Sequence, residues 1–379
     1  MFIDQIINSI ENINDRSPGM LIFFVTSRCN ARCPHCFNWK NINKKSRDLT
    51  LKEIEKLSLS MPRFKILLFS GGEPFLRTDL FEIVKLFYQN SGVREFIFPT
   101  NGSLSQKINK DVFKMLNFMP DAQISINFSI DGTGDYHDAK RSIPGCFSLI
   151  ENSIKNLRLL RHKFKDKLII KTNTVIMPDN LAQIPKLITY FENKHSDLDD
   201  NLFEIIRGSP KDDCLKTEIS KKDLLNIYNL VQEHRLRKLI SEKKSNLEII
   251  FRLANLILIQ DTQLHAYFKK GWGTPCLAGQ TIGVIDHNGF LRHCELREPV
   301  VNLHSYNMNF LKGWNSAGSI EERRKINKEK CWTNCTHICY LTDSLFRHKR
   351  TLLLKVPLSL IKSAFKTFSF MNNVKSLEF

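Results

Sequence analysis

A regular alternation of short apolar runs with helical patterns constrains the fold more than any other feature of this chain. The apolar runs are rich in Ile, Phe and Val and cover residues 21–26, 65–70, 95–100, 123–131, 167–176 and 201–208. Helical patterns between them cover residues 50–60, 79–89, 110–118, 146–163 and 180–192. Strands that alternate with helices at this spacing form βαβ units and a parallel sheet. The sequence therefore predicts an α/β protein, and periodicity alone leaves open a partial barrel or an open, doubly wound sheet.

The pattern changes after residue 208. Residues 211–270 are rich in Lys, Leu and Ile with few turn residues, so we expect a helical connection there. Residues 281–294 form two short apolar runs around the turn sequence DHNG, which predicts a β-hairpin.

The last segment, residues 341–379, is a basic tail. Five polar side chains share one face of a helix there, with Leu, Ile and Phe on the others: Lys355, Ser359, Lys362, Ser363 and Lys366. A basic amphipathic helix is typical of contact with a membrane surface or a partner helix. The alternative is that the apolar face of residues 352–370 packs against the body of the protein. Pro357 either starts this helix or kinks it.

The composition limits the classes of protein. The chain has 379 residues, enough for two or three domains. No run of about 18 apolar residues occurs, and the first residues carry Asp4 and no basic region, so we expect neither a spanning helix nor a signal peptide. A cytoplasmic location is therefore expected, with the ten cysteines reduced and available for metal binding or catalysis.

The charge is strongly positive. Lys and Arg number 56 against 39 Asp and Glu, which gives a net charge of +17. The lysines are scattered, and no zinc-finger, homeodomain or RNA-recognition signature accompanies them. We therefore expect loose attraction to anions and no specific nucleic-acid partner.

Three cysteines lie close together directly after the first predicted strand: Cys29, Cys33 and Cys36, in CNARCPHC. Zinc normally takes four ligands, usually as two separated pairs, and no second pair lies nearby. A disulfide is unexpected in a reducing compartment. Soft thiolates suit an iron–sulfur cluster. Three ligands on a four-iron cluster would leave one iron open to bind another molecule.

The CxxxCxxC spacing after the first strand of a βα repeat resembles the radical S-adenosylmethionine (SAM) superfamily. The resemblance implies that Cys29, Cys33 and Cys36 are the catalytic cysteines, which hold a 4Fe–4S cluster whose fourth iron binds SAM. One electron would then cleave SAM to a 5′-deoxyadenosyl radical that abstracts hydrogen from a substrate. It also implies a partial (β/α)6 radical SAM barrel over residues 20–210.

Motifs after later strands are similar to those of the same superfamily. Gly71, Gly72 and Glu73 end the second strand as its GGE motif does, which implies a close approach of the glycine backbone to SAM and a Glu73 carboxylate that binds the SAM ammonium. The other cofactor-binding positions that the resemblance implies are His35, Asn101, Ser129, Asp131 and Asn173. Turn chemistry is the alternative for Asn101, Ser129 and Asp131. His137 and Arg141 fit a recurring family segment without an assigned role.

Five more cysteines lie in the last third of the chain: Cys276, Cys294, Cys331, Cys335 and Cys339. With Gly289 before Cys294, they resemble the SPASM and shorter twitch extensions of radical SAM enzymes. This implies a small C-terminal domain with one auxiliary 4Fe–4S cluster that takes four of the five thiolates.

The ligand set of that cluster stays open at this point. Cys276 and Cys294 flank the predicted hairpin, and the other three recur every four residues, so all three could point together from a helix. A structural zinc site is the alternative. Cys146 and Cys214 stand alone and are expected to be buried apolar residues.

The resemblance implies an enzyme that modifies a peptide or protein side chain with a flavodoxin- or ferredoxin-type electron donor. The alternatives are oxidation or rearrangement of a small molecule, such as a sugar or a nucleotide-linked intermediate, or a non-catalytic metal-binding protein. The expected organisation is an N-terminal segment, a radical SAM core, a helical connection, an auxiliary-cluster domain and the basic tail, at residues 1–19, 20–210, 211–270, 271–340 and 341–379.

Overall fold

A computed structural model describes residues 17–377, and the side chains as far as residue 372. Six parallel strands follow one another across the sheet in chain order. They are β1 (Met20–Thr26), β2 (Ile66–Gly71), β3 (Glu95–Thr100), β4 (Gln123–Ser129), β5 (Leu168–Ile176) and β6 (Asp200–Ile205). The predicted α/β class with a parallel sheet is confirmed. The expectation about a signal peptide lies outside the described residues.

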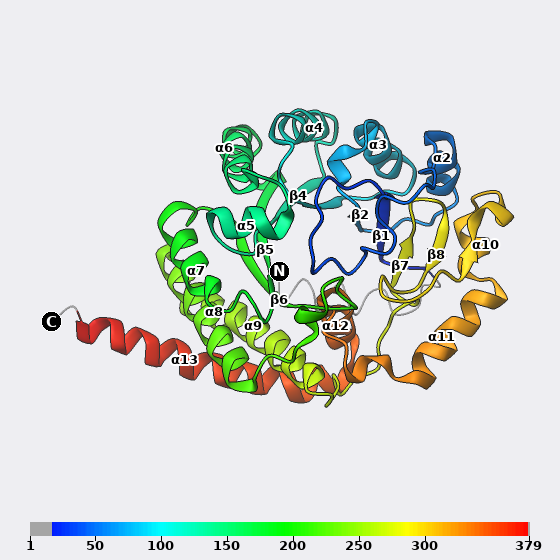
Figure 1. Cartoon of the computed structure of the whole chain (residues 1–379). Coiled ribbons are helices and arrows are strands. Elements are labelled where there is room, and N and C mark those ends of the chain that lie inside the picture. Colours follow the sequence, from blue (N-terminus) through cyan, green and yellow to red (C-terminus); the bar gives the residue numbers. More distant parts are fainter. Residues whose placement is uncertain (1–16, 378–379) are drawn as a thin grey trace.

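Helices connect these strands and lie on their outer side. They are α2 (Leu51–Leu59), α3 (Leu80–Asn90), α4 (Ser105–Phe118), α5 (Gly134–Arg141), α6 (Cys146–Phe164) and α7 (Gln183–Lys194). In Figure 1, α2, α3, α4, α6 and α7 form an arc around the strands. The short polar helix α5 was not predicted, and the other five agree with the predicted helical patterns apart from shifts at their ends.

Local chemistry explains where these elements begin and how they pack. The Thr50 side chain accepts a hydrogen bond from the Glu53 backbone N–H, and the Glu53 carboxylate accepts one from the Thr50 N–H, so a capping box starts α2. On the sheet, the rings of Phe69 and Phe98 stack with their centroids 4.7 Å apart. Burial of such rings holds the outer helices against the strands.

Three further strands extend the sheet beyond β1: β7 (Ile282–Ile285), β8 (Phe290–Arg292) and β9 (Val301–Asn302). The predicted hairpin is confirmed, because β7 and β8 pair antiparallel. The hairpin also joins the core sheet, since β7 pairs parallel with β1. The pairing satisfies the backbone groups that β1 would otherwise leave open at the edge. The boundary at residue 271 stays a prediction.

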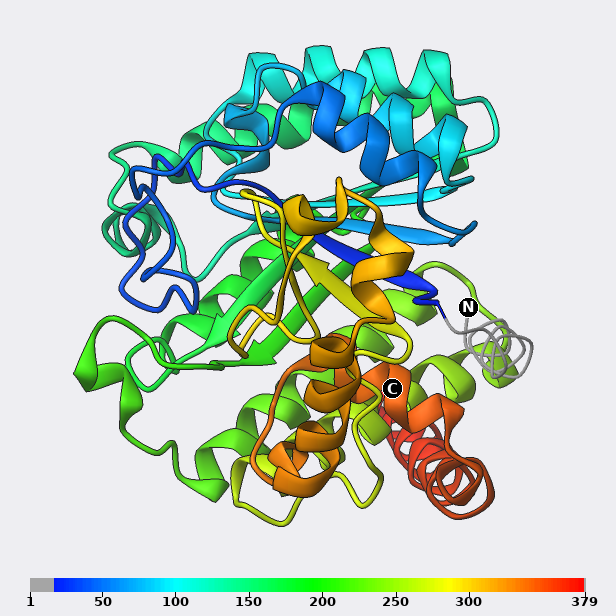
Figure 2. The ribbon, with the colours of Figure 1, turned by 90° about the vertical axis from the view of Figure 1, so that its right-hand side faces the viewer.

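The remaining elements are mostly helical. The predicted helical connection consists of α8 (Lys221–Ser241) and α9 (Asn246–Tyr267), and α10 (Phe310–Trp314), α11 (Ala317–Glu329), α12 (Ile338–Arg347) and α13 (Val356–Leu377) follow the hairpin. Short helical turns are Pro74–Leu76, Lys165–Lys167, Asp213–Lys216, Leu303–Tyr306 and Cys331–Thr333, with a π-helical turn at Thr351–Lys355. Figure 2 shows α13 on the outside of the molecule. No helix of residues 17–377 is long and apolar enough to cross a membrane.

The tail helix α13 packs against the body of the protein with small polar side chains, not with its large apolar ones. Pro357 stands at its start and does not kink it. Ser359 and Ser363 are buried, whereas Leu358 and Phe365 are 59% and 74% exposed. The expectation that the apolar face packs against the body of the protein is therefore wrong for this part of α13. Small side chains let α13 come close to α9, which bulky Leu and Phe would prevent.

Candidate active site

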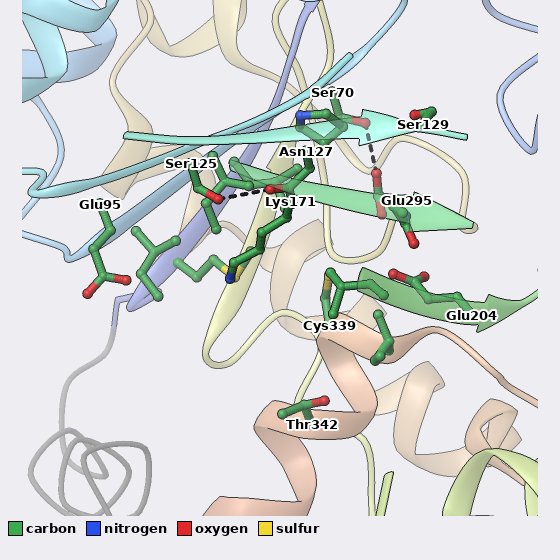
Figure 3. A pocket seen from close by; sticks show the side chains of 18 of the residues that line it. Ser70, Glu95, Ser125, Asn127, Ser129, Lys171, Glu204, Glu295, Cys339 and Thr342 are labelled. Carbon is green, nitrogen blue, oxygen red and sulfur yellow. Dashed lines mark hydrogen bonds between the residues drawn. The ribbon is translucent and has the colours of Figure 1, made fainter. Parts of the chain in front are cut away.

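A cavity of about 1310 Å³ runs along the inside of the parallel strands. Its lining includes residues from the amino ends of strands, such as Glu95, and from the carboxyl ends, such as Ser129. Alternate residues of β4 face it, because side chains alternate between the faces of a strand. Figure 3 shows Ser125, Asn127 and Ser129 along this wall, with Lys171 on the neighbouring strand β5 beside Asn127. The cavity is therefore polar on the inner face of the sheet.

Cys29, Cys33 and Cys36 lie in the loop between β1 and α2, and all three line this cavity. The Asn43 side chain accepts a hydrogen bond from the Cys29 N–H (3.0 Å) and donates one to the Cys29 carbonyl (3.1 Å). The Cys36 N–H donates to the Cys33 carbonyl at 3.2 Å. Burial raises the pKa of the Cys29 thiol to about 12 and that of Cys36 to about 11. The loop thus presents three free thiols to one space.

A buried ion pair stands behind Cys33. The Arg141 guanidinium lies 3.6 Å from Cys33 Sγ and 2.6 Å from Asp131 Oδ2. Although burial opposes it, this guanidinium holds the pKa of Asp131 below its ordinary value. The guanidinium can therefore balance the negative charge of a thiolate that binds iron. Asp131 does not line the cavity as expected of a cofactor-binding residue, and instead orients Arg141.

Two histidines flank this ion pair. His35 lines the cavity with its Nε2 atom 3.4 Å from Asp131, and His137 lies behind the wall, where its Nδ1 atom accepts the Asp131 backbone N–H. Burial lowers the pKa of each to about 4, so both rings are neutral near pH 7. His35 can therefore contact a ligand, whereas His137 supports the turn after β4.

The Gly71–Gly72–Glu73 turn supports the cysteine loop. A Cβ atom on Gly71 would lie 2.7 Å from the Thr26 carbonyl oxygen, and one on Gly72 would lie 2.0 Å from that of Arg28. The glycines are thus required for a close approach to the end of β1 and to the cysteine loop that follows it. The buried Glu73 carboxylate accepts hydrogen bonds from Thr100 Oγ1 and the Asn101 N–H, both at 2.8 Å.

The remaining predicted positions also reach the cavity. Asn101, Ser129 and Asn173 line it together with Gly71, Gly72 and Glu73. The buried atoms His35 Nδ1 and Asn173 Oδ1 have no hydrogen-bond partner in the structure. Buried polar atoms normally have partners. Three free thiols and two unpartnered polar atoms on one cavity therefore fit an iron–sulfur cluster with a polar ligand beside it.

The C-terminal cysteines separate into two groups. Burial is the main cause of the raised pKa values of Cys276 and Cys294. Nearby thiols raise them further: Cys331 and Cys335 act on Cys276, and Cys335 acts on Cys294. The charges that act on Cys339 are instead those of Glu204, Glu295 and Arg207. Cys339 lines the cavity, and the other four do not.

Cys331, Cys335 and Cys339 do not lie on one helix, although their spacing of four residues would allow it. Cys331 lies in a short helical turn, Cys335 in irregular chain, and Cys339 in the first turn of α12. Residues 334–337 are not helical and separate the short turn Cys331–Thr333 from α12, so no continuous helix spans the three. Of the two lone cysteines, Cys146 is buried as expected, whereas Cys214 is exposed and not buried.

No three His, Cys, Asp or Glu side chains among residues 17–377 converge closely enough to hold a single metal ion. The thiolates of a 4Fe–4S cluster each bind a different iron and are therefore further apart. Four free thiols, two of them buried (Cys276 and Cys294) and two half-buried (Cys331 and Cys335), fit such a cluster in their donor chemistry.

A charged group on the cavity wall was missed by the sequence analysis. The Arg207 guanidinium lies 3.0 Å from Glu204 and 3.6 Å from Glu295, and Glu295 also accepts hydrogen bonds from Ser70 and His337. Figure 3 shows Glu204, Glu295 and Cys339 facing the same space. Two sequence signals were available: Glu204 lies near the carboxyl end of a parallel strand, and Glu295 directly follows Cys294.

The chain has a parallel α/β sheet and a loop with three cysteines after its first strand. Comparison with known families identifies the class of protein with these features. Residues 23–191 match the radical SAM superfamily, so this part of the chain is a radical SAM domain. The expected fold and family are thereby confirmed, and the superfamily implies an iron–sulfur cluster and SAM as cofactors.

Curated relatives match mainly this domain. An AdoMet-dependent heme synthase of Methanosarcina barkeri is 30% identical over 176 residues, which cover 45% of this chain and 46% of the relative. A GTP 3',8-cyclase of Haemophilus influenzae is 30% identical over 159 residues, 38% of this chain and 45% of the relative. The chain thus spans about half the length of the curated relatives that it matches.

Solved structures match nearly the whole chain. Native anSMEcpe with bound AdoMet and Cp18Cys peptide has a TM-score of 0.56 at 16% identity, covering 94% of this chain and 99% of that one. Streptococcus suis SuiB bound to precursor peptide SuiA has a TM-score of 0.56 at 14% identity, covering 92% and 77%. At these identities the likeness shows a shared fold that includes the C-terminal region.

Proposed function

We propose that the protein is a radical SAM enzyme that holds a 4Fe–4S cluster on Cys29, Cys33 and Cys36 and modifies a substrate inside the cavity. The observation that carries this proposal is the meeting of three free thiols with Glu73 on one cavity of a radical SAM domain. When bound, the cluster and SAM supply a one-electron cleavage that yields a 5′-deoxyadenosyl radical. The electron would come from a flavodoxin- or ferredoxin-type donor.

The residues of the chain bind and orient the cofactors in this proposal. Arg141 balances the charge of the Cys33 thiolate, and Asp131 holds Arg141 in place. Glu73 accepts the SAM ammonium on lone pairs that Thr100 and Asn101 leave open. His35 and Asn173 offer the unpartnered Nδ1 and Oδ1 atoms to SAM, and Ser129 and Asn101 complete the polar wall.

We further propose that Cys276, Cys294, Cys331 and Cys335 hold an auxiliary 4Fe–4S cluster. Cys276 and Cys294 lie in one buried cluster against which Cys331 and Cys335 pack, and none of these four lines the cavity, which supports this ligand set. Cys339 then stays a free thiol on the substrate side of the cavity, beside Glu204 and Arg207. A structural zinc at the four cysteines is the alternative.

A peptide or protein side chain is the proposed substrate. Support comes from the overall likeness to anSMEcpe and SuiB, whose structures contain peptides, and from the size of the cavity. A small molecule is the second candidate, favoured by the names heme synthase and GTP cyclase among the relatives. A metal-binding protein without turnover is the third.

The test is formation of 5′-deoxyadenosine from SAM by the anaerobically reconstituted, dithionite-reduced protein. We expect product from the native chain and none from Cys33→Ala, which should retain the auxiliary iron. No product from a native chain that contains both iron and sulfide would favour the non-catalytic protein.

The substrate class is tested with a fully deuterated cell extract, separated by size into a peptide fraction and a small-molecule fraction. Hydrogen abstraction transfers deuterium to 5′-deoxyadenosine, which mass spectrometry detects. Deuterium transfer from the peptide fraction alone supports the peptide substrate, and transfer from the small-molecule fraction alone rejects it.

A further inference from the structure

The π-helical turn Thr351–Lys355 and the tail helix α13 that follows it expose five large apolar side chains on one side. Leu354, Leu358, Ile361, Phe365 and Phe368 are 55%, 59%, 54%, 74% and 51% exposed. They recur at intervals of four and three residues, so they form one stripe along the helix, which we call the α13 stripe. A contiguous exposed apolar stripe of this kind marks an interaction surface.

Polar contacts on the opposite side fix the orientation of this stripe. Ser363 Oγ donates to the Ile250 carbonyl at 2.7 Å, and the Lys362 ammonium pairs with Asp261 at 2.5 Å. Lys366 Nζ donates to the side chains of Asn229 (3.0 Å) and Gln232 (2.7 Å). Turning the stripe inward would break all of these contacts, so its exposure is a property of the folded helix.

The charge around the stripe indicates what covers it. Residues 344–377 contain seven Lys and Arg and no Asp or Glu. Lys349 and Arg350 are exposed just before α13, and Lys362 is largely exposed beside the stripe. The nearby acids are Asp261, which pairs with Lys362, and Glu233, which acts on Lys366. The surface is therefore positive around an apolar centre.

This charge distribution decides between two occupants. A second copy of residues 344–377 would bring seven more like charges to the same surface, three of them on α13 itself, which opposes pairing of identical helices. An anionic lipid surface instead supplies negative headgroups for the cations and an apolar layer for the stripe. No described helix can span a membrane, so α13 would lie in the plane of the interface.

We propose that α13 is an interfacial helix that seats the protein on an anionic membrane through the α13 stripe. The stripe provides the apolar contact, and Lys349, Arg350 and Lys362 provide the attraction to headgroups. This proposal is independent of the proposed function, because none of these residues lines the cavity.

The test is co-sedimentation of the full-length, anaerobically reconstituted protein with two kinds of vesicle, phosphatidylcholine alone and phosphatidylcholine mixed with phosphatidylserine. We expect binding to the mixed vesicles that weakens as salt rises. The double variant Leu358→Ser/Phe365→Ser should bind at least about tenfold more weakly, since each side chain contributes on the order of 1 kcal/mol or more when buried.

The matched control removes equally exposed leucines elsewhere: Leu59→Ser/Leu159→Ser, on α2 and α6, where the native residues are 65% and 64% exposed. It should bind vesicles like the native chain. Unchanged iron content in both variants confirms that they fold. Three results would overturn the proposal. The native chain would not bind the mixed vesicles, or both double variants would lose binding equally. The third is a dimer in solution that only Leu358→Ser/Phe365→Ser dissociates.

Discussion

Gly72 lies so close to Arg28 that no side chain fits between them. A Cβ atom on Gly72 would be 2.0 Å from the Arg28 carbonyl oxygen and 2.6 Å from its carbonyl carbon. The same carbonyl accepts a hydrogen bond from the Glu73 N–H at 2.8 Å. Because Arg28 directly precedes Cys29, the turn after β2 positions the first cysteine of the loop.

Gly72→Ala should therefore displace the cysteine loop. The overlap is with backbone atoms, which no rotamer change can relieve, so we expect a loss of about 1–3 kcal/mol in the free energy of unfolding and reduced iron at Cys29, Cys33 and Cys36. Urea unfolding and iron analysis after anaerobic reconstitution measure both. Gly318→Ala is the control, because its Cβ atom would meet nothing closer than 3.7 Å within α11. Equal behaviour of the two variants would show that the close approach is unimportant.

The C-terminal cysteines should differ in their effect on iron content. Cys335→Ser should remove about half of the total iron if two 4Fe–4S clusters are present, because Cys335 packs against the buried cluster that contains Cys276 and Cys294. Cys339→Ser should retain all of it, because its neighbours are Glu204, Glu295 and Arg207. Iron and labile sulfide per chain provide the measurement.

Cys214→Ser controls for the loss of any thiol, since Cys214 is exposed. Loss of auxiliary iron from Cys339→Ser with retention in Cys335→Ser would reverse the proposed ligand set. Retention of iron in both variants, with bound zinc in the native chain, would favour the zinc site.

The buried His137 should make the protein less stable in acid. Burial lowers its pKa to about 4 in the folded state, from an ordinary value of 6.5. Between these values the unfolded chain binds more protons, so stability falls as the pH drops from about 6.5 to about 4, by up to about 1.4 kcal/mol per pH unit for this group. His137→Asn keeps an acceptor for the Asp131 N–H but does not titrate.

When the pH is lowered from 6.5 to 5, the free energy of unfolding should fall for both proteins. We expect the fall to be smaller for His137→Asn than for the native chain, by up to about 2 kcal/mol. Urea unfolding at several pH values measures this difference. His162→Asn, at an exposed position on α6, should keep the native pH dependence. A native-like slope for His137→Asn would contradict the buried, neutral state of His137.

The sequence was sufficient for the parallel sheet and for most of the cavity wall. Apolar runs identify buried parallel strands, and the carboxyl ends of those strands meet at one edge, so Cys29, Glu73 and Ser129 could be placed together without a structure. Asp131 was harder to assign, because a carboxylate after a strand can face the ligand or, as here, a buried arginine.

The parts that could not be predicted depend on contacts between distant segments. The pairing of β7 with β1 joins residues far apart in the chain, and no local pattern indicates it. The orientation of α13 depends on the Ile250 carbonyl of α9, which accepts the Ser363 hydroxyl. The separate position of Cys339 depends on the non-helical residues 334–337, which the regular spacing of the three cysteines does not reveal.

The most direct test of the central claim is the electron paramagnetic resonance spectrum of a chain that keeps only the first cluster. The variant Cys276→Ala/Cys294→Ala removes the auxiliary site, and its dithionite-reduced spectrum is recorded with and without SAM. We predict the signal of one reduced 4Fe–4S cluster, with g values that shift when SAM binds and a signal that disappears when Cys33→Ala is added. A signal that SAM leaves unchanged, or zinc without labile sulfide at Cys29, Cys33 and Cys36, would contradict the claim.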